Sequence, residues 1–311
     1  MRIEHAFQEE RDILAHALHV SLNWRGYIYQ VVGFVGAVLL FNLFQEIGVA
    51  AGLTYDQPNI PMMKNPWYYI FTVLGAGLGY CWLSAANSAV VKIADERMLG
   101  HLGVGHVLVQ RFLTKSAVAV VLLPAVCYGI ALTATLLLCI FGAVGEVEHA
   151  GNFLLAVLIL PIFLIALAGF VATYVGLFVL PALTGGESTS PRETVSEILS
   201  VARWSPHRML LRHASAILGS LVIAAPFCFV AQGALFLIDW AMAQVVGPGA
   251  SLLGYVQSFE GFLPSLLANS ALGIVAAFVF ALPISFLSTA SLLIHRAAQE
   301  TIDESREAYL E

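Results

Sequence analysis

Charged side chains are scarce in this sequence. Asp, Glu, Lys and Arg make up 11% of its 311 residues, whereas soluble domains carry roughly 25%. Hydrophobic residues make up 59%, and the mean hydropathy is +0.85. This composition excludes a water-soluble globule and predicts a protein whose main partner is the lipid bilayer. We expect no nucleic-acid partner.

The sequence also lacks the usual signatures of a reactive centre. It contains no HExxH, P-loop or GxSxG motif, and its nine histidines fall in loops or at expected helix ends, so no pair is placed to hold a haem within the bilayer. All four cysteines lie inside apolar runs, which is typical of small core residues rather than of a disulfide framework: Cys81, Cys127, Cys139 and Cys228. We therefore expect no catalytic centre, no metal and no cofactor.

Long apolar runs are abundant instead. About 20 apolar residues are enough for a helix to cross the roughly 30 Å hydrocarbon core of a bilayer. Six runs meet this requirement and predict an all-α, polytopic membrane protein with spans at about 27–46, 67–91, 116–142, 153–181, 214–238 and 268–294. Amphipathic patterns predict helices along the membrane surface or against partners at about 3–22, 92–112, 190–210 and 251–263.

The lysines and arginines predict the orientation of these spans. Of the 14 such residues, Lys64 alone falls on one side of the predicted membrane, and the other 13 fall on the opposite side. Because basic loops stay in the cytoplasm, both termini and the amphipathic linkers are expected there. The chain then divides into three hairpins, 1–91, 92–183 and 184–296, in the inner membrane of a bacterium.

Two short basic segments stand at the expected cytoplasmic thresholds of spans three and five. Arg111–Lys115 and Arg208–Arg212 align without gaps at an offset of 97 residues, and each opens into a long apolar run. Basic side chains at this depth contribute about 1 kcal/mol each to the attraction of anionic headgroups. Contacts to headgroups or to a partner are therefore expected at Arg111, Lys115, Arg208 and Arg212.

Small and polar residues in the spans predict helix packing. Gly75 and Gly79 are four residues apart and share one helix face, which lets a neighbouring backbone approach closely. Ser84, Asn87 and Ser88 continue toward the cytoplasmic end, where such groups commonly form hydrogen bonds between helices. The acids Glu46 and Asp239 lie near the outer ends of their spans, as solvated helix ends do.

Prolines within four spans leave two alternatives open. A proline frees a backbone carbonyl and kinks a helix, and transporter sites are often built at broken helices near the midplane. Proline is nevertheless ordinary in membrane helices. The candidates for midplane helix breaks are Pro124, Pro161, Pro226 and Pro283.

The layout of three long hairpins with amphipathic linkers resembles the membrane domains that accompany some bacterial glycerophosphodiester phosphodiesterases. The resemblance covers most of the chain but rests on no motif, and the chain has no phosphodiesterase domain, so it implies no site. From the residues we expect a non-enzymatic scaffold or accessory subunit of a larger membrane complex, joined to other membrane subunits or to copies of itself. The alternative is a permease or channel subunit for a small or lipid-like solute, which the four prolines favour.

Overall fold

The structure is a computed structural model that describes residues 2–53, 65–101, 106–145, 151–186, 190–204, 206–247, 250–252, 254 and 262–310. Over these residues the chain is 95% helical and contains no strand. Six of its helices are long and apolar enough to cross a membrane. The predicted all-α fold with six spans is therefore confirmed, whereas the cytoplasmic location of the termini stays a prediction.

The helices follow the predicted order along the chain. They are α1 (Arg2–Ser21), α2 (Trp24–Leu53), α3 (Pro66–Met98), α4 (His106–Lys115), α5 (Ala117–Gly145), α6 (Gly151–Tyr174), the π-helix η2 (Val175–Val179), α7 (Leu180–Gly186), α8 (Pro191–Trp204), α9 (Pro206–Val245) and α11 (Phe262–Leu310). The six candidate spans are α2, α3, α5, the continuous run from α6 through η2 to α7, α9 and α11.

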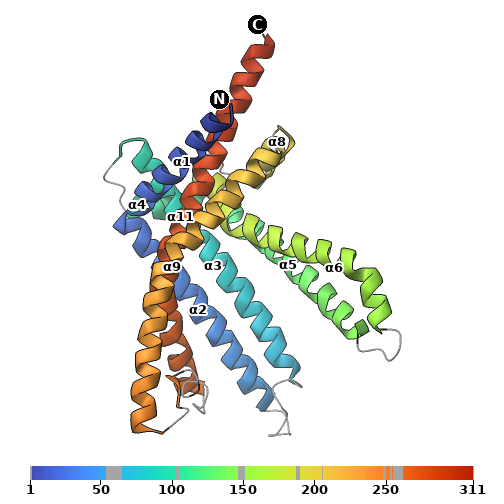
Figure 1. The fold of residues 1–311 in the computed structure, drawn as a ribbon, viewed down its shortest axis with the longest axis vertical. Helices are drawn as coiled ribbons and strands as arrows, with labels where there is room; N and C mark the ends of the chain where they lie inside the picture. The colour runs from blue at the N-terminus through green and yellow to red at the C-terminus, as the bar shows by residue number, and fades with distance from the viewer. Residues whose placement is uncertain are drawn as a thin grey trace.

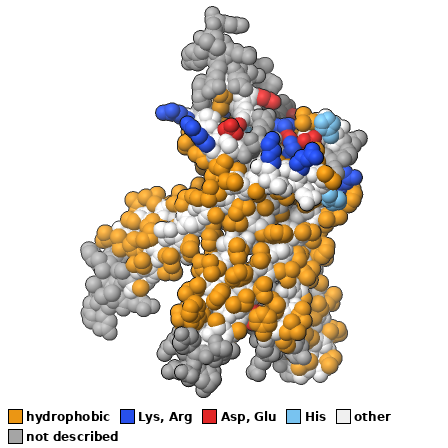
Figure 2. All heavy atoms as spheres, turned by 180° about the vertical axis from the view of Figure 1, so that it is seen from behind, with side chains coloured by type: hydrophobic (Ala, Val, Ile, Leu, Met, Phe, Trp, Pro, Cys, Tyr) orange, Lys and Arg blue, Asp and Glu red, His pale blue; other side chains and the backbone are white. Residues whose placement is uncertain are grey.

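The long helices separate as they leave one end of the molecule (Figure 1). Away from that end, the helices run in pairs: α2 lies beside α3, and α9 lies beside α11. The third pair, α5 and α6, forms an arm that points away from the other helices. Both termini lie at the end where the helices converge, together with α1, α4 and α8. We call this the charged end, because lysine, arginine, acidic and histidine side chains gather there above a broad hydrophobic surface (Figure 2).

Glycines allow α2 and α3 to pack closely. Gly75 and Gly79 are both buried in α3 and face α2. A Cβ atom on Gly79 would lie 2.8 Å from the carbonyl oxygen of Ala37, and one on Gly75 would lie 3.2 Å from that of Phe41. Because both neighbouring atoms belong to the backbone of α2, they could not move aside without shifting the helix. The predicted close contact at these glycines is thus made within the chain.

Replacing Gly79 with leucine should therefore destabilise the protein. Overpacking of this kind costs roughly 1–3 kcal/mol, and we expect a lower melting temperature in detergent. Gly129→Leu is the matched control, because a Cβ atom there meets nothing within 4 Å, and both variants gain the same helix propensity. Equal melting temperatures for the two variants would show that α2 and α3 do not depend on this close approach.

The second half of the amphipathic helix α1 packs against the core of the protein. Ala17 is fully buried in a cluster with Phe286, Ala290 and Ile294 of α11 and with Ala216 of α9. An apolar stripe at helical spacing requires only an apolar cover, and its pattern does not distinguish lipid from protein. The described apolar side chains of α1, including Ile13, Leu14 and Leu18, are thus part of the core at the charged end, and a location of 3–22 along the membrane surface stays a prediction.

Several element bounds differ from those predicted. α3 continues past residue 91 to Met98, and the last span and the acidic tail form one helix of 49 residues, α11. The predicted helix within 190–210 is confirmed as α8, whose Val201 packs against Ala298 and Ile302 of α11. Most of the predicted segment 251–263, namely 253 and 255–261, lies outside the described residues.

The two acids at the end remote from the charged end bind neighbouring segments. Glu46 of α2 accepts a hydrogen bond from the Ser265 hydroxyl of α11. The Asp239 carboxylate of α9 accepts one from the backbone N–H of Leu252 at 2.7 Å. Each acid therefore ties the end of one span to the segment beside it.

The prolines do not interrupt their helices. Pro124, Pro161, Pro226 and Pro283 lie within α5, α6, α9 and α11, and each helix continues through its proline. The structure therefore shows no break at these four positions, and a part of these prolines in transport stays a prediction. A membrane helix tolerates the missing N–H because neighbouring groups and small backbone adjustments can satisfy the freed carbonyl.

Candidate functional site

Among the described spans, the fourth departs from α-helical geometry. Between α6 and α7, the five residues Val175–Val179 form a π-helix, in which the N–H of Leu180 bonds to the carbonyl of Val175. Such wider turns are rare and frequently occur at functional sites. This interruption is the centre of the candidate site.

Pro181, two residues after the end of the π-helix, explains why this segment needs outside partners. Proline has no N–H, so position 181 provides no donor to the carbonyls four and five residues before it, those of Leu177 and Gly176. Buried carbonyls without a donor are costly, above all within a bilayer. The site therefore requires hydrogen-bond donors from another helix.

The third helix supplies those donors. Asn87 Nδ2 donates to the carbonyl of Leu177 at 2.6 Å, and Ser84 Oγ donates to that of Gly176 at 2.8 Å. One turn further along α3, the Tyr80 hydroxyl donates to the carbonyl of Thr173 at 3.0 Å. Positions 80, 84 and 87 are spaced by four and three residues and so share one helix face, which brings all three donors to the same side of the interrupted helix.

The contact continues into α7. Ser88 Oγ lies 3.2 Å from Thr184 Oγ1, which also donates to the carbonyl of Leu180 at 2.9 Å. Gly185 permits this approach, because a Cβ atom there would lie 2.9 Å from the carbonyl oxygen of Ser88. The side chains on both sides of this interface are at most 2% exposed, so it is closely packed: Ser84, Asn87, Ser88 and Thr184.

Gln30 of α2 completes the cluster. Its Nε2 donates to Asn87 Oδ1 at 2.9 Å, and both side chains are fully buried. The Gln30 Oε1 atom has no hydrogen-bond partner among the described residues. The cluster thus consists of neutral amides and hydroxyls with one vacant acceptor. Groups of this kind can orient helices or bind a polar, uncharged group, but they offer no activated nucleophile.

A second polar region lies nearby at the charged end. Asp95 of α3 is 3% exposed and forms an ion pair with Arg296 of α11. Lys92 approaches Asp95 at 3.3 Å and Glu96 at 3.0 Å. The Lys92 pairs lie within α3, whereas the Arg296–Asp95 pair joins α3 to α11. The α3 helix therefore contacts both the interrupted helix and the last span.

The predicted site residues lie apart from this cluster. Arg111 and Lys115 are exposed on α4, Arg208 is exposed on α9, and Arg212 is half-buried there. These residues lie on two helices at the charged end, where contacts to headgroups or a partner stay a prediction. Among the described residues, no group of three or more His, Cys, Asp or Glu side chains could hold a metal ion.

The sequence predicted some residues of the cluster but not that they contact the fourth span. Ser84, Asn87 and Ser88 were expected to form hydrogen bonds between helices, whereas Gln30 was not singled out and Pro181 only marked the expected end of a span. A usable signal was present: three polar side chains share one face of a membrane helix, and a proline near the end of another span frees carbonyls for them.

Comparison of the chain with known proteins gave no match. No family model matches it, and neither a curated protein nor a solved structure shows significant similarity to it.

Proposed function

We propose that this protein is a non-enzymatic subunit of a larger membrane complex, with its charged end in the cytoplasm of a bacterium and its spans in the inner membrane. In this role it acts as a scaffold or accessory subunit. One observation carries the proposal: a polar side chain on the outer face of α9, within the apolar part of the span.

That side chain is Gln232. It is exposed and lies seven residues before Asp239, about 10 Å along the helix axis. The described part of the chain gives its amide no hydrogen-bond partner. A primary amide facing hydrocarbon is unfavourable unless another group pairs with it, and glutamines commonly form hydrogen bonds across membrane helices.

The surroundings of Gln232 favour a helix as the partner. Ala225, Phe229, Gln232 and Phe236 follow a four-three-four spacing and so share one face, and all four are exposed. Gly233 beside them has nothing within 4 Å of a Cβ position, which leaves room for another backbone. We infer that a transmembrane helix bearing a hydrogen-bonding side chain covers this face, either from a different subunit or from a second copy.

Gln232→Leu should release that partner. We expect the variant to keep its melting temperature as an isolated chain but to migrate as a smaller particle after mild detergent extraction. Thr133→Val is the control, because Thr133 is also exposed in a span but bonds to the Gly129 carbonyl of its own helix at 2.8 Å. If wild type and Gln232→Leu form particles of equal size, the proposed contact does not exist.

The proposed orientation can be tested by cysteine labelling. In a background free of native cysteines, Gln244→Cys at the end of α9 should react with a membrane-impermeant maleimide in intact cells. Ser196→Cys on α8 should react only after the membrane is opened, because α8 precedes the opposite end of α9, which we place in the cytoplasm. Both positions are exposed, so neither is protected by burial. Labelling of Ser196→Cys in intact cells would invert the proposed orientation.

The interrupted fourth span supports a permease as the second candidate. Transporter sites are often formed where a membrane helix is broken, and here the vacant Gln30 acceptor lies beside that break. For a permease, Gln30→Met should abolish cellular function while the complex stays assembled. For a scaffold, cellular function should follow assembly in every variant, including Gln232→Leu.

A further inference from the structure

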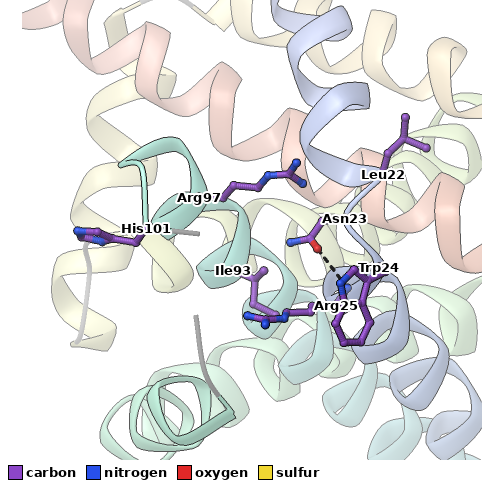
Figure 3. A pocket seen from close by; sticks show the side chains of 7 residues that line it. All are labelled: Leu22, Asn23, Trp24, Arg25, Ile93, Arg97 and His101. Atoms are coloured by element: carbon purple, nitrogen blue, oxygen red, sulfur yellow. Dashed lines mark hydrogen bonds between the residues drawn. The ribbon is translucent and has the colours of Figure 1, made fainter. Parts of the chain in front are cut away.

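A cavity of about 320 Å³ lies at the charged end, between the turn from α1 to α2 and the last turn of α3. Its walls carry two arginines, Arg25 and Arg97 (Figure 3). Arg97 extends from α3 toward that turn, whereas Arg25 extends from α2 toward α3, so the two guanidinium groups enter from opposite walls. Both arginines are half-buried, which reduces the screening of their charge by water.

Two acids of α3 near this cavity, Asp95 and Glu96, face other cations. Glu96 lies 3.0 Å from Lys92 Nζ and 2.9 Å from His101 Nδ1, and Asp95 pairs with Arg296. His101 also lines the cavity. The ionisable side chains that line the cavity, those of Arg25, Arg97 and His101, are thus all basic. Guanidinium groups suit phosphate in particular, because their paired N–H groups match two phosphate oxygens.

An apolar stripe leads from the cavity along α2. Trp24 lines the cavity and is 64% exposed, and Ile28 and Val32 follow at steps of four residues with exposures of 46% and 53%. Tryptophan is typical of the boundary between headgroups and hydrocarbon. A molecule with its phosphate between Arg25 and Arg97 could thus lay an acyl chain along Ile28 and Val32.

We propose that this cavity is a binding site for the phosphate group of an anionic phospholipid, whose acyl chain follows the exposed stripe of α2. The phosphate forms its contacts with Arg25 and Arg97, and Trp24 packs beside the glycerol region. The site uses residues other than Gln232 and the four basic residues predicted from the sequence, so it does not depend on the proposed partner helix.

The test is lipid retention by the detergent-solubilised protein, measured by native mass spectrometry. With phosphatidylglycerol and phosphatidylcholine added in equal amounts, wild type should retain the anionic lipid preferentially. Arg25→Gln/Arg97→Gln should weaken that retention at least about tenfold, because each basic side chain contributes about fivefold at a lipid surface. Arg192→Gln/Arg203→Gln removes the same charge from exposed positions of α8 outside the cavity and should retain the lipid like wild type.

Three outcomes would overturn the proposal. Equal retention of both lipids by wild type would show that the cavity does not select a negative charge. Equal losses in the two double variants would assign the effect to general charge at this end. Inorganic phosphate that raises the melting temperature of wild type as much as phosphatidylglycerol does would identify a site for free anions. Trp24→Ala/Ile28→Ala keeps both arginines and should weaken lipid retention without changing the response to inorganic phosphate.

Discussion

Arg296→Met should lower the free energy of unfolding by roughly 3 kcal/mol, the lower end of the range for breaking a buried ion pair. The Asp95 side chain is 4% exposed, and it would be left with Lys92 at 3.3 Å as its remaining basic partner. Because α3 and α11 meet through this pair, the loss should be visible as a lower melting temperature in detergent.

Two further variants separate the ion pair from general effects of arginine. Asp95→Asn/Arg296→Met removes the buried charge together with its partner and should recover much of the lost stability. Arg203→Met removes an exposed arginine of α8 and should change stability little. A loss in the double variant as large as in Arg296→Met would show that the arginine stabilises the protein by packing alone.

Asn87→Leu should cost about 3 kcal/mol, because the Leu177 carbonyl and the Gln30 amide each lose a partner, and a buried group left unpaired costs roughly 1–3 kcal/mol. Thermal unfolding in detergent measures this loss. Thr135→Val is the control, because the exposed Thr135 hydroxyl bonds to the Ala131 carbonyl of its own helix at 2.9 Å, and it should unfold like wild type.

A second-site variant tests the reason for the π-helix. Pro181→Ala restores an N–H at position 181, which can bond to the Leu177 carbonyl in a regular α-helix, and Leu180 can then bond to Gly176. Asn87→Leu/Pro181→Ala should therefore be more stable than Asn87→Leu alone. Additive losses from the two changes would contradict the role assigned to Pro181.

The spans were predictable from sequence because whether a segment can cross a membrane depends on that segment alone. Length and lack of charge define each run by itself, and the six predicted spans correspond to the six candidate helices. The close approach at Gly79 was also expected, since a small residue every four positions marks a face where a backbone can pass. Its partner, Ala37 of α2, could not be predicted, because the spacing does not say which helix lies opposite.

The candidate site was harder to predict because its parts come from three helices. Asn87 by itself was consistent with any contact between helices, and Pro181 by itself was an ordinary span end. Their relation depends on the register of α3 against α7, which brings the amide to the Leu177 carbonyl. The four prolines singled out from the sequence lie in helices that continue through them. The sequence does not show which freed carbonyls need a new donor, so it did not distinguish these prolines from Pro181.

Photo-crosslinking from the outer face of α9 tests the central proposal most directly. A photoreactive residue in place of Phe236, which is 69% exposed on the face of Gln232, should form a discrete protein adduct in intact membranes. The same residue in place of Phe163, which is 62% exposed on α6, should react mainly with lipid, and Gln232→Leu should abolish the adduct at position 236. Only lipid adducts at position 236 in wild-type membranes would contradict the account of this protein as a complex subunit.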